Sequence, residues 1–135
     1  MPENRSARDL PFYRLEQAEQ CLKTALDVYN LGDLKATANR SYYCIFHCMR
    51  AVLATKQLDS RKHSGVISLF RHEFIKSGAF PSSLSRVIDD AFDLRGSSDY
   101  DDFYIAPKEA ILRQLNDAEQ FLTATKDYLT NLYKD

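Results

Sequence analysis

The sequence has no tryptophan and few of the residues that turn a chain sharply. Its 135 residues include 4 glycines, 4 prolines and 3 cysteines. So few glycines and prolines exclude a β-sandwich or barrel built from many tight turns, and an odd cysteine count does not describe a disulfide framework. No apolar run approaches the roughly 20 residues of a membrane span, and residues 1–5 lack the apolar segment of a signal peptide. We therefore expect a cytoplasmic protein with no membrane contact.

Neither positively nor negatively charged residues are in clear excess. The 18 lysines and arginines nearly balance the 19 aspartates and glutamates, giving a net charge of −1. A chain without a positive field is not suited to general, salt-driven coating of nucleic acid, so any such binding has to be local. The apolar fraction of 44% excludes disorder over the whole chain. The length is that of one domain, which we expect to span residues 1–135, with a flexible N-terminus at 1–9.

Apolar residues recur at steps of three and four along most of the chain, which is the period of a helix face. Together with the glycines and prolines, this pattern predicts helices over about 11–31, 34–56, 65–76, 81–94 and 107–133, and an irregular segment at 96–102. Gly32 suits a helix C-terminus, and Asp33 and Ser64 suit N-caps. The prediction is an all-α fold, an antiparallel up-and-down bundle of four long helices plus a short one.

The helix predicted at 34–56 carries a polar stripe beside its apolar face. Arg40, Tyr43, His47 and Arg50 follow one another at steps of three, four and three. Arg40 and His47 are therefore two turns apart and point almost the same way, roughly 10 Å apart along the axis. Arginine binds phosphate well and histidine transfers protons near neutral pH. The alternative is that the tyrosine and histidine are hydrogen-bonded at the edge of the core while the arginines are solvated.

Two further positions could bind an anion. Arg95 continues the inward stripe of the helix predicted at 81–94, and a buried guanidinium needs an anion or several acceptors. It could face a ligand, or form a structural clasp with Asp99, which is followed by Tyr100. His63 and Lys62 precede a predicted helix start, where backbone amides favour anions, although such residues are more often ordinary capping residues.

Two other patterns resemble known sites without the surroundings that those sites need. Cys44, His47 and Cys48 share a helix face, but no second ligand pair follows at zinc-site spacing, so we expect buried free thiols and no metal or cofactor. Residues 96–101 superficially resemble a nucleotidyltransferase signature. That chemistry needs a strand to present its carboxylates, and the sequence predicts none there.

Several segments, taken in order, resemble one family. Residues 39–47 read NRSYYCIFH and are similar to the NRAYYAxFH helix of a prokaryotic branch of HEPN-domain proteins. Residues 62–67, KHSGVI, match the next segment of that branch, and residues 74–81 fit its following connection. Residues 95–103, RGSSDYDDF, resemble its RxxADYxxF motif. The resemblance spans about residues 10–130.

The resemblance implies a helical bundle that forms homodimers. It also implies a toxin-like protein that binds RNA or a nucleotide, acts as a metal-independent endoribonuclease, and pairs with a minimal nucleotidyltransferase as its antitoxin. Ribonuclease members carry an Arg-x4–6-His motif in which the arginine binds phosphate and the histidine transfers protons. Arg95 falls on the arginine of that motif, but Tyr100 stands where the histidine is expected. A phenol with an ordinary pKa of about 10 is a poor proton shuttle at neutral pH.

Two hypotheses follow. In the first, His47 replaces the missing imidazole; the catalytic residues are His47, Arg95 and Tyr100, and the binding residues are Arg40, Tyr43, His63 and Asp99. In the second, the protein is a non-catalytic helical adaptor of a nucleotidyltransferase. Arg95 and Asp99 then form a structural clasp, and the tyrosines form an interface.

Overall fold

The computed structural model describes residues 6–134. Its five α-helices are α1 (Asp9–Asn30), α2 (Leu34–Ala54), α3 (His63–Phe70), α4 (Leu84–Tyr100) and α5 (Lys108–Leu132), and a π-helical turn (Arg71–Ile75) continues α3. Across the described residues there is no strand. The all-α prediction of four long helices and a short one is confirmed. None of the helices within residues 6–134 is both long enough and apolar enough to cross a bilayer.

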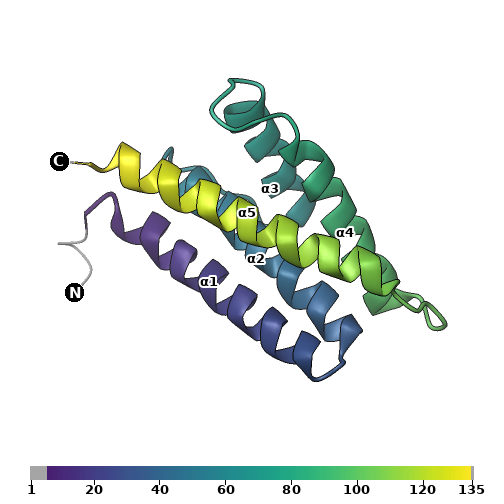
Figure 1. Cartoon of the computed structure of the whole chain (residues 1–135). Coiled ribbons are helices and arrows are strands. Elements are labelled where there is room, and N and C mark those ends of the chain that lie inside the picture. Colours follow the sequence, from purple (N-terminus) through teal and green to yellow (C-terminus); the bar gives the residue numbers. More distant parts are fainter. Residues whose placement is uncertain (1–5, 135) are drawn as a thin grey trace.

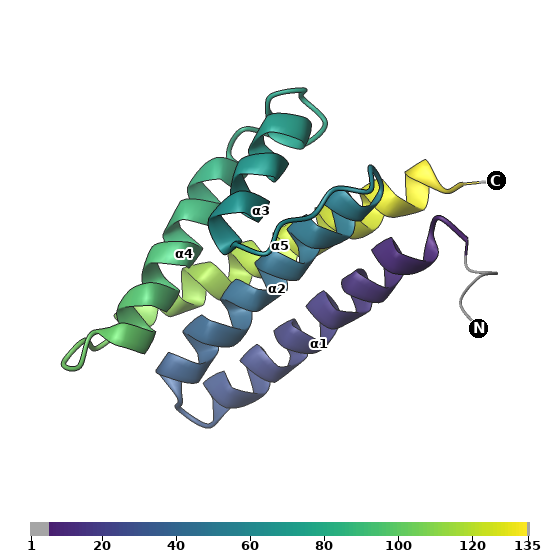
Figure 2. The same ribbon diagram turned by 180° about the vertical axis from the view of Figure 1, so that it is seen from behind.

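Helix α2 lies at the centre of the bundle. It runs antiparallel to α1, α5 packs against both helices, and α3 and α4 lie on the side of α2 away from α1 (Figures 1 and 2). Helix α2 contacts each of the other four helices, and 13 of its 21 residues are buried. The three cysteines are free and buried. The core is therefore built around one helix that has little surface of its own.

Buried polar groups of α2 are bonded to its neighbour α5. The side-chain amide of Gln114, which is 5% exposed, donates to the Ser41 hydroxyl at 2.7 Å and to the Ala38 carbonyl at 3.1 Å. Ser41 in turn donates to the carbonyl of Thr37 at 2.7 Å. Because buried polar groups are costly when unpaired, these bonds fix the position of α5 along α2.

Local hydrogen bonds and one glycine determine where α1 begins and ends and where α2 begins. Residues 1–5 of the expected flexible N-terminus lie outside the described residues; the amide and hydroxyl of Ser6 donate to the Asp9 carboxylate at 2.9 and 3.1 Å, and α1 begins at Asp9 rather than at Pro11. Gly32 adopts a φ of +85°, as predicted. The Asp33 side chain accepts from the Ala36 amide at 3.0 Å, which confirms the N-cap.

Helices α3 and α4 differ most from the sequence prediction. Helix α3 begins at His63 with Lys62 as N-cap, so the prediction that Ser64 caps a helix from residue 65 is wrong. Helix α4 begins at Leu84 and continues to Tyr100, so the irregular segment predicted at 96–102 is helical up to residue 100. Glycine and serine are weak helix formers, but Ser98 is buried and Arg95 pairs with Asp99 one turn on. Packing and this ion pair outweigh the local propensity.

Gly65, in the first turn of α3, lies against the segment that leads into the helix. A Cβ at this position would collide with the Ser60 side chain, with only 2.8 Å to the Ser60 Cβ. We expect Gly65→Ala to lower the free energy of unfolding by about 1–3 kcal/mol, because overpacking displaces backbone. Urea denaturation measures the change.

The matched control is Gly96→Ala, where the new Cβ would meet nothing within 4 Å. Since Gly96 lies within α4, we expect it to stabilise by about 0.5–1 kcal/mol. Adding Ser60→Gly to Gly65→Ala should restore much of the loss. Equal tolerance of alanine at both glycines would contradict the steric account.

Candidate functional site

Arg95 contacts Tyr43 of α2 and Asp99 of its own helix. Only 16% of its side chain is exposed. Its Nη2 donates to the Tyr43 hydroxyl at 3.1 Å. Its Nε lies 3.2 Å from Oδ2 of Asp99, but the N–H does not point along that line and has no hydrogen-bond partner among the described residues. Asp99 is therefore an ion-pair partner, so the Arg95–Asp99 contact that the clasp alternative requires is present.

Aromatic rings surround the same guanidinium. The Cζ of Arg95 lies 5.2 Å from the ring centroid of Tyr42, 5.5 Å from that of Tyr43 and 5.9 Å from that of Tyr100. The Cζ of Arg40 lies 5.1 Å from the Tyr43 ring. Two guanidinium groups thus use the face of one phenol as a cation–π partner. Tyr100 itself is 74% exposed at the end of α4.

Asn39 joins the two arginines, and sequence reasoning did not assign it a role. Its Oδ1 accepts from Nη2 and Nε of Arg40 at 2.7 and 2.9 Å, and its Nδ2 donates to Oδ2 of Asp99 at 3.2 Å. The available signal was its place beside Arg40 at the head of the 39–47 motif. We call this set the Arg95 cluster: Asn39, Arg40, Tyr42, Tyr43, Arg95, Asp99 and Tyr100.

His47 lies on a neighbouring face. It lines a cleft of about 700 Å³ between α1 and α2, together with Arg40 and α1 residues such as Gln17. Burial, followed by the nearby charge of Arg50, lowers the pKa of His47 to about 4, so the imidazole is neutral at pH 7. Its Nδ1 is buried with no partner in the described part of the chain. Between His47 and Arg95 there is no bond within residues 6–134; Tyr43, 6.1 Å from His47 between ring centroids, lies between them in the contact network.

His63 is the imidazole that lies on the side of Arg95. As the first residue of α3, it places Nδ1 2.8 Å from the Tyr42 hydroxyl. Its ring centroid lies 4.2 Å from that of Phe46 and 5.7 Å from that of Tyr43. Burial, and after it the charge of Arg95, lowers the pKa of His63. The structure therefore brings His63 to the rings that hold Arg95, although the sequence analysis gave it only an anion-binding role.

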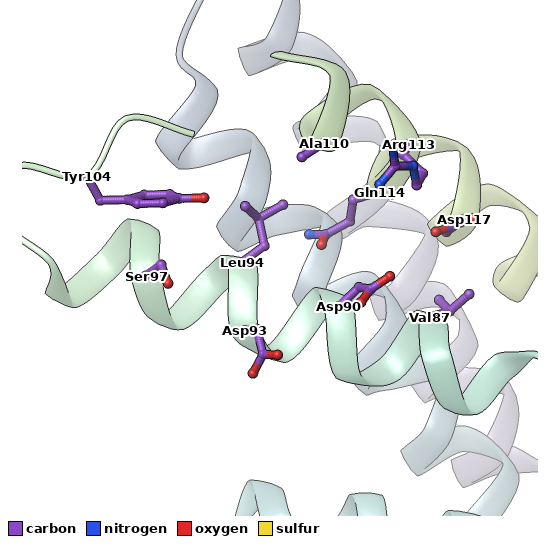
Figure 3. A pocket seen from close by; sticks show the side chains of 10 residues that line it. All are labelled: Val87, Asp90, Asp93, Leu94, Ser97, Tyr104, Ala110, Arg113, Gln114 and Asp117. Atoms are coloured by element: carbon purple, nitrogen blue, oxygen red, sulfur yellow. The ribbon is translucent and has the colours of Figure 1, made fainter. Parts of the chain in front are cut away.

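A second cavity, of about 260 Å³, lies between α4 and α5. Figure 3 shows the Tyr104 ring at one end, with Asp90 of α4 and Asp117 of α5 toward the other. Burial raises the pKa of Asp117. The lining also includes Asp93, and none of the residues predicted to form the site from sequence is part of it. With three aspartates against one arginine, Arg113, its walls are poorly suited to phosphate.

The Arg95 cluster has the chemistry of an anion-binding site. Two neutral imidazoles lie near it, His63 beside the rings that hold Arg95 and His47 on the neighbouring face. Arginine presents a planar fork of N–H donors that matches phosphate oxygens. A neutral imidazole can accept a proton on one nitrogen and donate a hydrogen bond from the other. The exposed Tyr100 ring offers a surface on which an unpaired base can stack.

Comparison with known proteins gives one consistent family. The model of the HEPN domain matches residues 13–128. A protein of Methanocaldococcus jannaschii named "Putative toxin MJ0142" is 36% identical over 115 residues, covering 85% of this chain and 78% of that protein. A "UPF0332 protein" of Thermotoga maritima is 30% identical over 129 residues, covering 96% and 97%. Another of that name from Archaeoglobus fulgidus is 33% identical over 117 residues, covering 84% and 90%.

The lowered pKa of His47 makes stability depend on pH. Below the ordinary value of 6.5 the unfolded chain takes up a proton on His47, whereas the folded chain does not until about pH 4. Folding stability contributed by the neutral histidine is therefore complete above pH 6.5 and is lost as pH falls from 6.5 toward 4. Because His47 is only half-buried, solvent screening reduces this effect, and we expect a loss of roughly 1–2 kcal/mol in the free energy of unfolding on acidification. The variant His47→Gln should not show this loss.

Urea unfolding of both proteins near neutral pH and in mild acid measures the difference. The control is His72→Gln, because His72 is an exposed histidine with 69% of its side chain accessible. An identical pH dependence in wild type and His47→Gln would show that His47 titrates normally.

Proposed function

Because this chain belongs to the HEPN domain family, we propose that it is a toxin-like RNA-binding protein with metal-independent endoribonuclease activity. We further propose that a minimal nucleotidyltransferase serves as its antitoxin. The name of the relative MJ0142 supports the toxin-like part. The observation that carries the proposal is the Arg95 cluster, in which Arg40 and Arg95 share the ring of Tyr43. Two ordered guanidinium groups beside an exposed phenol are suited to one phosphodiester and its base.

The residues of the site have separable roles in this proposal. Cleavage forms a bond between the ribose 2′ oxygen and phosphorus and breaks the bond from phosphorus to the 5′ oxygen. Arg40 and Arg95 bind the phosphate oxygens, on which negative charge increases in the transition state. His47, which is neutral at pH 7 and lines a cleft together with Arg40, accepts the proton from the 2′ hydroxyl. That proton, carried by His47 or exchanged through water, ends on the departing 5′ oxygen, and Tyr100 donates a hydrogen bond to the phosphate.

The partners are proposed from the surface next to the cluster. Phe92 and Tyr100, 38% and 74% exposed, lie on α4 beside Arg95, and Phe103 and Ile105 follow at 97% and 85%. Exposed apolar residues gathered in this way are typical of interaction sites. We assign Phe92 and the surface of α4 around it to a homodimer interface that leaves Tyr100 open to RNA, and the segment with Phe103 and Ile105 to the antitoxin.

One observation favours a second function, that of a non-catalytic adaptor. Arg95 is already paired with Asp99 and bonded to Tyr43, and the residue at the expected histidine position is Tyr100. An arginine held in this way can hold α4 on α2 without any ligand. In this alternative the cluster is structural, and the exposed aromatic residues bind the nucleotidyltransferase.

Incubation of the purified protein with total RNA in EDTA separates the two functions. We expect wild type to cleave, and Arg95→Ala and His47→Ala to lose activity by about a hundredfold or more, as for loss of a phosphate ligand or a general base. Circular dichroism establishes that each variant is folded.

The matched control is Arg86→Ala, which removes an exposed arginine of α4 that pairs only with Asp90 among the described residues, and it should retain full activity. Cleavage that persists in His47→Ala but not in Arg95→Ala would remove His47 from the mechanism. No cleavage by the folded wild type would favour the adaptor.

A further inference from the structure

A cleft of about 600 Å³ lies between α2 and the segment leading into α3. It is adjacent to the Arg95 cluster, because His63 on its wall is bonded to Tyr42, over which Arg95 lies. The residues that line it are Phe46, Arg50, Asp59, Ser60, Arg61 and His63. Only His63 among them belongs to the binding residues predicted from sequence.

Positive charge is in excess around this cleft. The carboxylate of Asp59 accepts from Arg50 at 2.8 and 3.2 Å and from Arg14 at 3.2 Å. One carboxylate thus serves two guanidinium groups. Arg61 is exposed and forms no ion pair or hydrogen bond in the described part of the chain. The cleft therefore has unneutralised cationic charge, which favours an anionic ligand.

The hydrogen bond between Tyr42 and His63 determines which imidazole nitrogen carries the proton. Tyr42 is 1% exposed, and burial raises its pKa to about 12, so its hydroxyl stays protonated. This bond is the only one that the buried hydroxyl forms among the described residues, and its hydrogen needs an acceptor, so it donates to Nδ1 of His63, 2.8 Å away. With Nδ1 acting as acceptor, the proton of the neutral ring is on Nε2. Tyr42 is thus a buried hydrogen-bond partner that fixes the tautomer of His63.

The Nε2–H group of His63 has no partner within the described residues, and it is not among their buried unsatisfied atoms. It lies on the edge of the ring away from Nδ1, which faces Tyr42. The ring of Phe46, 4.2 Å away between centroids, packs against the imidazole and fixes its plane. An oriented, accessible donor next to unpaired positive charge is suited to an anionic acceptor.

We propose that this cleft is a second phosphate site, in which a phosphate of single-stranded RNA accepts a hydrogen bond from Nε2 of neutral His63 and pairs with Arg61. Tyr42 is the positioning residue that sets the tautomer. The inference rests on the proposed RNA binding and deepens it. The chain then holds two neighbouring phosphates, one at the Arg95 cluster and one at this cleft, and His63 serves as a donor rather than as a general base.

The tautomer is tested first, by long-range proton–nitrogen NMR correlation of the histidine rings. We expect wild-type His63 to show the Nε2–H form, and Tyr42→Phe to shift it to a mixture of both tautomers. Tyr43→Phe is the matched control, because it removes a neighbouring hydroxyl that bonds Arg95 and not His63, and it should leave the tautomer unchanged. An Nδ1–H form in the wild type overturns the proposal without any variant.

The ligand is tested by titrating the labelled protein with a short single-stranded RNA and, separately, with inorganic phosphate. We expect RNA to move the His63 Nε2 signal, and Arg61→Ala to weaken RNA binding roughly tenfold and reduce its salt slope by about one. His63→Phe, which keeps a ring and removes the donor, should weaken binding to a similar extent.

The other possible outcomes overturn the proposal, and they distinguish failure of the cleft from failure of the proposed function. RNA that moves signals of the Arg95 cluster but leaves His63 unchanged overturns the cleft and leaves the proposed function intact. RNA that moves neither overturns both. A His63 response to inorganic phosphate without any response to RNA assigns the cleft to a small phosphate ligand and overturns the RNA assignment.

Discussion

The central position of α2 is the constraint on which the rest of the structure depends. A helix in contact with four others cannot leave its polar side chains to water, and an unpaired buried polar group costs a few kcal/mol. Three of these polar positions are instead completed by three different neighbours. Ser41 is bonded by Gln114 of α5, Tyr42 by His63 of α3, and Tyr43 by Arg95 of α4. Packing around α2 thus creates the candidate site as well as the core.

The same packing explains how a chain with a net charge of −1 can hold a local cationic surface. Arginines from α1, α2 and α4 lie around α2, and only a few carboxylates, such as Asp59 and Asp99, pair with them. Burial and these arginines keep His47 and His63 uncharged. The site therefore combines permanent guanidinium charge with neutral imidazoles, whose nitrogen atoms can form hydrogen bonds without adding charge.

The periodicity of apolar residues was sufficient to predict the helical fold, and the spacing of residues along one helix was sufficient to predict part of the site. Residues that interact one turn apart, such as Arg95 and Asp99, can be paired from their positions alone. Tyr42 and His63 are 21 positions apart, and Tyr43 and Arg95 are 52 apart. Their pairing depends on how α3 and α4 are docked, which periodicity does not specify. The helical state of residues 96–100 was missed for the same reason, because burial of Ser98 is a tertiary effect.

The stacking of Arg40 and Arg95 on Tyr43 also has an entropic consequence. Long guanidinium side chains lose up to about 2 kcal/mol of rotamer freedom when they are fixed. Here that freedom is lost when the bundle folds, since both groups are already immobilised on the ring and by Asn39, Asp99 and the Tyr43 hydroxyl. A ligand meets a preorganised surface and has little ordering left to impose. Tyr43 thus lowers the entropic cost of ligand binding, because the rotamer freedom of both arginines is already lost on folding, where it reduces the stability of the fold.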